Sequence, residues 1–181
     1  MFPLNWLKVI VPTLLACAAV ATTAVAQDRF DMKIATEIGR QIERYPQLTI
    51  FDDVNGSVDG GVVTLTGKVT MPYKKSDIGK RAATVEGVRN VVNNIDVLPV
   101  SPYDDELRRR IARAIYGNAA FWRYGASANP PIHIIVEGGH VTLTGVVGTN
   151  VDRVLARSLA TGFGELSVTN ELRTDAEVKS N

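Results

Sequence analysis

Histidine is the side chain best suited to proton transfer near neutral pH, and the chain has two, His133 and His140. The glycine pair Gly138–Gly139 between them predicts a two-residue hairpin turn. In such a hairpin His133 pairs with Thr144 and His140 pairs with Glu137, so the two imidazoles are not neighbours. A metal ion or an acid–base pair needs groups that converge on one point. We therefore interpret both histidines as ordinary strand residues.

Two further motifs imitate known sites but lack essential residues. Residues 125–129 lack the final glycine of a nucleophile elbow. Residues 53–59 alternate oxygen-bearing side chains as a calcium loop does, but Val58 stands at the loop's glycine position and Thr64 at its glutamate position. The sequence thus predicts no catalytic residue, no metal site, no cofactor and no enzymatic activity.

Two clusters have the chemistry of a binding surface. Residues 68–85 carry five basic side chains and one acid, a local charge of +4, whereas residues 28–59 carry four basic and seven acidic side chains, a charge of −3. Basic surfaces attract anionic lipid headgroups, and aromatic residues around an arginine suit a membrane interface or a partner groove. The candidate contact residues are Lys74, Lys75, Lys80, Arg81, Phe121, Trp122, Arg123 and Tyr124.

Each cluster also has an ordinary structural interpretation. The basic residues fit a helix face that is simply solvated. The aromatic residues fit the hydrophobic core of a domain, or the interface between two domains. The sequence does not decide between these interpretations and the binding ones.

The N-terminal 26 residues have the pattern of a secretory signal peptide. Lys8 precedes an apolar run from Val9 to Ala21, and residues 24–26 are Ala, Val and Ala, the pattern that signal peptidase requires. We expect cleavage after Ala26 and a periplasmic mature protein. A retained membrane helix is the alternative, because residues 9–26 are just long enough to span a bilayer. A second alternative is a lipoprotein anchored through Cys17, since residues 14–17 resemble a lipobox.

Composition limits the partners of the mature chain. The 181 residues include 20 Lys and Arg against 19 Asp and Glu, and a dedicated nucleic-acid-binding protein usually has a basic excess. We therefore expect no nucleic-acid partner. Lys8 is the one charged residue and Cys17 the one cysteine in residues 1–26, so the mature chain is neutral and has no thiol chemistry.

The sequence after residue 26 contains two copies of one repeat unit. Residues 58–67 and 136–145 match at eight of ten positions, with a constant offset of 78. Apolar residues at helical spacing precede each copy, and a second helix and a final strand follow it. The expected elements are helices near 74–84 and 151–161 and strands at 88–97 and 166–172. The predicted fold class is α+β, with two tandem αββαβ modules, each a three-stranded mixed sheet with two helices on one face.

These motifs resemble the BON domain, a family named after bacterial osmotically inducible periplasmic proteins and nodulation proteins. The resemblance covers residues 29–99 and 102–174, followed by a flexible tail at 175–181, and it implies the αββαβ fold, a non-enzymatic role and residence in the bacterial envelope. Gly67 and Gly145 match the structural glycine of the family, and residues 118–131 are an extension that the first copy lacks. Asn93 and Asn170, in register with apolar strand residues, are interpreted as structural amides that bind a neighbouring loop.

The leading hypothesis is a periplasmic protein that binds the cell envelope, at anionic phospholipid, in envelope integrity or osmotic stress protection. The family resemblance, the local charge of +4 and the aromatic cluster support it. The rival hypothesis is a chaperone-like stress factor that binds unfolded or envelope proteins.

Overall fold

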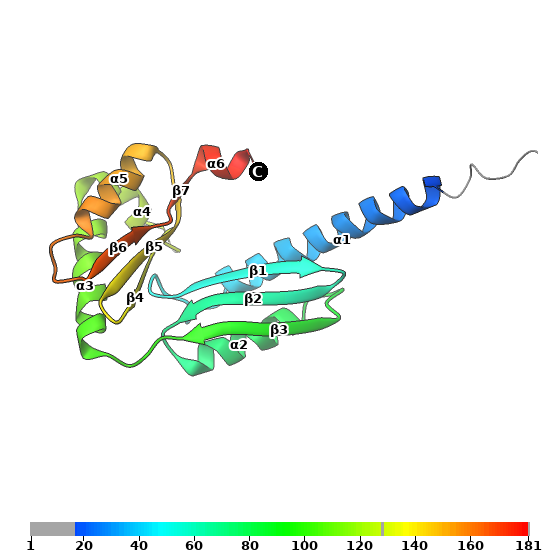
Figure 1. Ribbon diagram of the computed structural model, residues 1–181, viewed down its shortest axis with the longest axis horizontal. Helices are drawn as coiled ribbons and strands as arrows, with labels where there is room; N and C mark the ends of the chain where they lie inside the picture. The colour runs from blue at the N-terminus through cyan, green and yellow to red at the C-terminus, as the bar shows by residue number, and fades with distance from the viewer. Residues whose placement is uncertain (1–16, 128, 181) are drawn as a thin grey trace, which may run out of the picture.

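The computed structural model describes residues 17–127 and 129–180, with side chains described from Gln27 onward. The order helix, hairpin, helix, strand occurs twice along the chain (Figure 1). The first module consists of α1 (Cys17–Glu43), β1 (Asp53–Asp59), β2 (Val62–Val69), α2 (Pro72–Ala83) and β3 (Asn90–Val97). The second module consists of α3 (Pro102–Tyr116), the 3₁₀ turn η1 (Ala119–Phe121), α4 (Trp122–Gly125), β4 (Ile132–Glu137), β5 (His140–Val147), α5 (Asn150–Leu159), β6 (Ser167–Asn170), β7 (Arg173–Thr174) and α6 (Asp175–Lys179).

Each module contains a mixed sheet, which confirms the predicted fold class. β2 is antiparallel to β1 and parallel to β3, and β5 is antiparallel to β4 and parallel to β6. The β4–β5 register places His133 opposite Thr144 and His140 opposite Glu137, as the glycine pair predicts. The second sheet departs from the prediction of one final strand over 166–172. Pairing with β5 is interrupted after Asn170 and resumes in β7, which gives this sheet a fourth strand.

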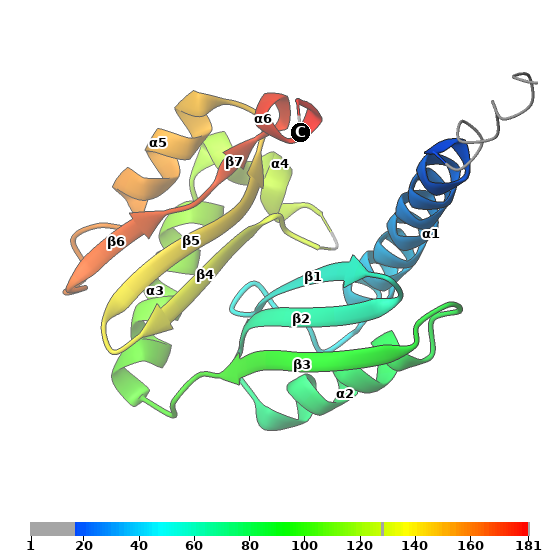
Figure 2. The same ribbon diagram turned by 45° about the vertical axis from the view of Figure 1, so that its right-hand side comes forward.

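Helices cover one face of each sheet and form the cores there. In α1, the side chains of Ile34, Ile38 and Ile42 form a buried stripe at helical spacing, and the helix ends three residues before Pro46. α1 and α2 contact the first sheet, whereas α3 and α5 contact the second (Figure 2). The fully buried side chains of the two cores include Leu65, Ile78, Ile95, Ile111, Ile115, Phe121, Ile134 and Leu143.

The N-terminal part of α1 projects beyond the sheets (Figure 1). The helix is continuous from Cys17 to Glu43 and therefore includes the predicted cleavage position after Ala26. Residues 1–16 of the predicted signal peptide lie outside the described residues. Among the helices that the structure describes, none has the length and hydropathy needed to cross a membrane.

The C-terminal residues differ from the predicted flexible tail. Residues 175–179 form α6, which begins with a capping box. The Thr174 hydroxyl accepts from the Glu177 amide at 3.3 Å, and the Glu177 carboxylate accepts from the Thr174 amide at 2.8 Å. Glu177 also pairs with Arg153 of α5 at 2.9 Å. These contacts attach the short helix to the second module.

The two modules are joined by more than the linker. The segment before β1 lies along β4, where the Ile50 carbonyl accepts a hydrogen bond of 2.7 Å from the Ile134 amide. Ile50 and Phe51 pack against the core of the second module. Lys68 of β2 forms an ion pair with Glu137 of β4. First-module residues thus complete the packing of the second module.

Candidate binding surfaces

The structure buries Lys74, which the sequence places among the membrane contacts. Its side chain is 3% exposed, and its Nζ lies 2.6 Å from the carboxylate of Asp52, which is fully buried. Thr70 and Thr49 also donate to this carboxylate, at 2.7 to 2.8 Å. Burial tends to raise the pKa of Asp52, but these hydrogen bonds outweigh it and hold the pKa below its usual value. Lys74 therefore has a structural role and is not a membrane contact, which corrects the prediction from the sequence.

The other three basic candidates on α2 lie nearer to the surface. Lys80 is exposed, and Lys75 and Arg81 are half-buried. The Arg81 guanidinium lies 4.9 Å from the centre of the Tyr45 ring, and the Tyr45 hydroxyl donates to Asp77 at 2.9 Å. Burial, aided by the bond to Asp77, raises the pKa of Tyr45 to about 12. Lys75 and Lys80 thus form the accessible basic part of α2, with Arg81 partly occupied by Tyr45.

The aromatic cluster is divided between core and surface. Phe121 is 0% exposed and belongs to the core of the second module, so it is also withdrawn as a surface contact. Trp122 is 70% exposed. Arg123 donates to Asp152 at 2.6 Å, and the Tyr124 hydroxyl donates to the same carboxylate at 2.9 Å. Of the four residues, Trp122 is the one whose side chain is mainly free for a partner.

The equivalent position of the two modules carries opposite charges. Lys74 and Asp152 are both the third residue of their helices, 78 positions apart. Lys74 is neutralised by Asp52, whereas Asp152 is neutralised by Arg123 from the extension at 118–131. Burial tends to raise the pKa of Asp152, but hydrogen bonds from Thr149 and Tyr124 and the charge of Arg123 hold it below its usual value. The extension therefore supplies a cation that the second module needs.

The predicted structural residues have equivalent contacts in both modules. Gly67 and Gly145 have φ angles of +114° and +111°, and an added Cβ would lie 2.1 Å and 1.9 Å from a carbonyl oxygen. Asn93 and Asn170 are half-buried, and each donates at 2.8 Å to a helix carbonyl, that of Lys75 or of Arg153. Their partners are helices and not the loops that the sequence suggests. These amides join the final strand of each module to its second helix.

The sequence interpretation missed an acidic residue that fixes the hairpin turn of each module. Asp31 accepts from the amides of Gly60 and Gly61 at 2.8 and 3.0 Å. In the second module, Asp104 accepts from both amides of the Gly138–Gly139 turn, at 2.9 and 2.8 Å. The first helix of each module thus holds the hairpin through one carboxylate.

Replacing Asp104 with alanine is expected to lower the free energy of unfolding by about 2 kcal/mol, because two turn amides lose their acceptor and one of them is buried. Urea denaturation measures the change. Glu106→Ala is the control, since its pair with Arg109 is exposed and its loss should cost less than about 0.5 kcal/mol. Equal effects of the two substitutions would contradict the proposed role of Asp104.

An exposed apolar cluster surrounds the turn of the second module. Tyr103 is 54% exposed and Leu166 is 71% exposed, and both lie within 3.5 Å of the position that a Cβ on Gly139 would take. The Tyr103 hydroxyl donates to the Gly164 carbonyl. The Arg110 guanidinium lies 5.2 Å from the centre of the Phe163 ring. We name Tyr103, Phe163, Leu166 and Arg110 the apolar tip.

The first module has a related but more polar tip. Phe30 directly precedes the turn-binding Asp31, as Tyr103 precedes Asp104, and its ring lies against Gly87. Arg89 is the first-module equivalent of Leu166. The amide of Arg89 donates to the carbonyl of Gly61, and the amide of Leu166 donates to the carbonyl of Gly139. The two turns lie at opposite ends of the molecule (Figure 2).

A family model described as "BON domain" matches residues 30–99 and 103–176. The chain belongs to the BON domain family. The match comprises two tandem copies, and the BON family is one of non-catalytic binding domains found at the bacterial envelope. Membership therefore supports an envelope-associated binding role for this chain.

Other comparisons add little to the BON assignment. No curated protein matches the chain. Among solved structures, CdsD, a structural protein of the type III secretion system of Chlamydia trachomatis, is 15% identical, with 82% of this chain and 96% of that chain covered and a TM-score of 0.30. The C-terminal domain of CdsD is 13% identical, with 78% and 65% covered and a TM-score of 0.32. Neither superposition is close enough to inform the function of this chain.

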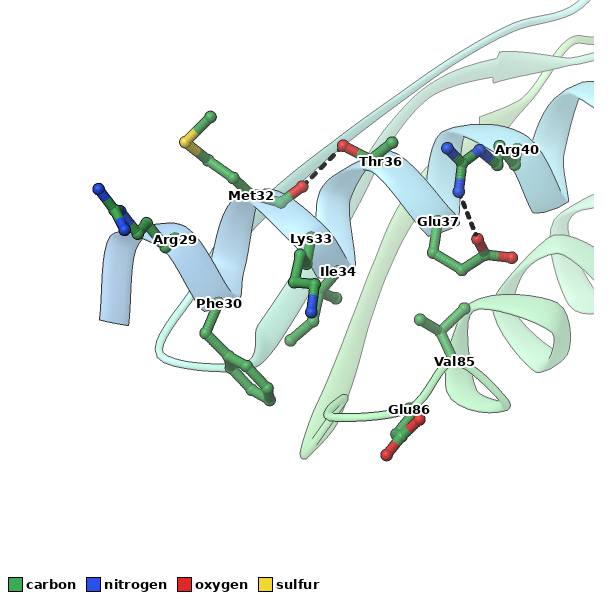
Figure 3. Close-up of a pocket in the computed structure, with 10 residues that line it drawn as sticks. All are labelled: Arg29, Phe30, Met32, Lys33, Ile34, Thr36, Glu37, Arg40, Val85 and Glu86. Carbon is green, nitrogen blue, oxygen red and sulfur yellow. Dashed lines mark hydrogen bonds and ion pairs between the residues drawn. The ribbon is translucent and has the colours of Figure 1, made fainter. Parts of the chain in front are cut away.

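The first BON module has an open cleft beside Phe30. It has a volume of about 640 Å³ and lies between α1 and the turn that follows α2. Figure 3 shows Phe30, Ile34 and Val85 on its apolar side and Lys33 and Arg40 along α1. Arg40 pairs with Glu37 at 3.1 Å, and Glu86 lies at the opposite rim. The cleft thus combines apolar surface with partly neutralised basic side chains.

Neither histidine of the BON modules belongs to a cluster with catalytic geometry. His133 Nδ1 lies 2.6 Å from the Asp52 carbonyl oxygen, and His140 Nδ1 lies 2.8 Å from the Ser167 hydroxyl. In the part of the chain that the structure describes, no group of three His, Cys, Asp or Glu side chains could hold a metal ion.

Proposed function

We propose that this BON protein is exported to the periplasm after cleavage behind Ala26 and binds anionic phospholipid surfaces of the envelope, in envelope integrity or osmotic stress protection. The apolar tip carries the proposal. Tyr103 and Leu166 project from adjoining segments at one end of the second module, with Arg110 beside them. Amphipathic aromatic and aliphatic side chains next to arginine match the interface between headgroups and acyl chains.

Exposed cations elsewhere on the chain support the same partner. Lys75 and Lys80 remain accessible on α2. A basic residue near an anionic bilayer contributes about 1 kcal/mol, which salt reduces. The cations would attract the protein to the surface, and the apolar tip would insert.

Replacing Leu166 with aspartate is expected to weaken binding to phosphatidylglycerol vesicles by about tenfold or more, because insertion of one leucine contributes about 1.5–3 kcal/mol. Co-sedimentation of the chain from Gln27 onward measures binding, since this chain retains both cores. Phosphatidylcholine vesicles should bind it more weakly, and 0.5 M salt should reduce binding to phosphatidylglycerol.

Val151→Asp is the matched control, because Val151 is also an exposed aliphatic residue but lies at the start of α5. It should bind vesicles as the unmodified chain does. If neither vesicle binds the unmodified chain, or if Leu166→Asp binds as well as Val151→Asp, the membrane proposal is wrong. Suppressed aggregation of a denatured protein by the same sample would then support the chaperone-like alternative.

Trp122 distinguishes two modes of membrane contact. It is the one tryptophan in the chain from Gln27 onward, and α4 lies at the end of the second module opposite the apolar tip (Figure 2). Co-sedimentation without a blue shift of its emission indicates contact through the tip. A blue shift with phosphatidylglycerol places Trp122 and Arg123 at the membrane.

A further inference from the structure

The outer edge of β1 offers free backbone groups in the first module. β1 is an edge strand, and its two-residue turn makes Asp59 and Val62 a hydrogen-bonded pair. The alternation of an antiparallel ladder then directs the amides and carbonyls of Val54 and Gly56 away from β2. Within residues 17–127 and 129–180, no other strand pairs with this edge.

This edge opens into a cleft between the two modules. The cleft has a volume of about 620 Å³, and α1 forms one wall, with Ala35, Ile38 and Gly39. A Cβ added to Gly39 would meet no atom within 4 Å, so the wall leaves space beside the strand. Pro131 and His133 of the second module line the opposite side. The space is bounded by a helix on one side and a free strand edge on another, a geometry suited to an extended chain.

The charge of the cleft favours a basic occupant. Glu43 and Asp53 line it, and no lysine or arginine is among its described lining residues. Lys68, the cross-strand neighbour of Asp53, is already paired with Glu137. The cleft therefore presents carboxylates without a competing cation at its rim.

The protein already uses a related contact in its second module. β4 is the counterpart of β1, and its edge binds the segment before β1 through the hydrogen bond from the Ile134 amide to the Ile50 carbonyl. Ile50 also lines the cleft. The edge of β4 is thus contacted by the turn at residues 49–52 through one backbone hydrogen bond, and within the described residues no backbone segment forms such a bond with the equivalent groups of β1.

We propose that the β1 edge binds an extended basic peptide segment of another protein. The peptide backbone pairs with Val54 and Gly56 as an added strand. Every second side chain of the peptide enters the cleft between β1 and α1, beside Glu43, and the intervening ones lie on the opposite face of the sheet, beside Asp53. This site shares no residue with the apolar tip, so peptide binding and membrane binding can be tested independently.

A fluorescein-labelled hexapeptide that alternates lysine and valine is the probe, and its anisotropy with the chain from Gln27 onward is the measurement. We expect saturable binding, and shifts of the Val54 and Gly56 amide signals in NMR spectra. The matched peptide that alternates glutamate and valine should bind about tenfold more weakly. A lysine–valine peptide with alternate backbone nitrogens methylated should also lose binding, because it lacks the donors of an added strand.

Two variants locate the site. Gly39→Leu should weaken peptide binding about tenfold by filling the cleft, whereas Ala83→Leu on the exposed end of α2 should not change it. Glu43→Lys should weaken it several-fold, and Glu171→Lys in the second module should not. Absence of binding at millimolar protein, equal binding of the acidic or methylated peptide, or unchanged binding by Gly39→Leu would each overturn the proposal. Leu166→Asp should bind the peptide normally, which separates this result from the vesicle experiment.

Discussion

Replacing Lys74 with alanine will lower the free energy of unfolding by about 3–5 kcal/mol, because it leaves a buried carboxylate without its counter-ion. Asp52 is fully buried, and Lys74 Nζ lies 2.6 Å from it. The remaining donors, from Thr49 and Thr70, are neutral groups. Urea denaturation at pH 7 measures the loss.

Lys75→Ala is the control for this prediction, since it removes the same charge from the adjacent, half-buried position. It should change the free energy of unfolding by less than about 0.5 kcal/mol. A loss below about 1 kcal/mol for Lys74→Ala would show that the buried pair does not stabilise the first module. The double variant Asp52→Asn with Lys74→Met should recover part of the loss, because it removes both charges.

The same pair predicts an acid dependence of stability. The pKa of Asp52 is lower in the folded protein than in the unfolded chain, where an aspartate has a pKa of about 3.9. Its contribution is therefore complete above about pH 4 and is lost as the pH falls through the folded pKa. In Asp52→Asn, this part of the acid sensitivity should be absent from urea midpoints measured between pH 7 and pH 2.

Replacing Gly145 with alanine will destabilise the second module by about 3 kcal/mol or more, because two costs combine. The φ angle of +111° is strained for any residue with a Cβ. The added Cβ would also lie 1.9 Å from the Pro131 carbonyl oxygen, so the backbone directly before β4 must move. Thermal unfolding of the chain from Gln27 onward measures the effect.

Gly138→Ala separates the cost of a positive φ angle from the cost of a steric clash of the added Cβ. Gly138 has a φ angle of +59°, but its added Cβ would meet no atom within 4 Å. We expect a loss of about 1 kcal/mol from the backbone conformation alone. Gly67→Ala should resemble Gly145→Ala, since its Cβ would lie 2.1 Å from the Asp53 carbonyl. Similar losses for Gly138→Ala and Gly145→Ala would refute the close approach as the cause.

The fold could be predicted from the sequence because the repeated hairpin is marked by features of neighbouring residues. These are the alternation of apolar and polar residues in the strands and the glycine pair at each turn. The Gly60–Gly61 and Gly138–Gly139 pairs set the register of both hairpins. The acids that hold these turns were harder to find. Asp31 and Asp104 are 73 residues apart instead of 78, because the second copy is longer between its first helix and its hairpin. A search at one constant offset does not align them.

The candidate sites were less predictable, because exposure depends on distant partners. Lys74, Ile78 and Ala82 occupy one buried face of α2, and that spacing was visible in the sequence. The partner of Lys74, however, is Asp52, which lies 22 residues earlier in the segment before β1. Phe121 is the last residue of a three-residue 3₁₀ turn, which is too short to show a helical period in the sequence. The apolar tip combines residues of α3 with residues of the loop that follows α5, about 55 positions later in the chain, so no local pattern indicates it.

The opposite charges of Lys74 and Asp152 bear on how two similar modules fold without exchanging parts. Tandem copies of one sequence risk misassembly, with a helix of one copy packed on the sheet of the other. If α2 took the place of α5, the ammonium of Lys74 would face the guanidinium of Arg123, and if α5 took the place of α2, the carboxylate of Asp152 would face Asp52. Both exchanges would bring like charges together, and the second would do so at Asp52, which is fully buried. The opposite charges therefore disfavour a misassembled protein in which α2 and α5 have exchanged sheets, and they favour packing of each helix on the sheet of its own module.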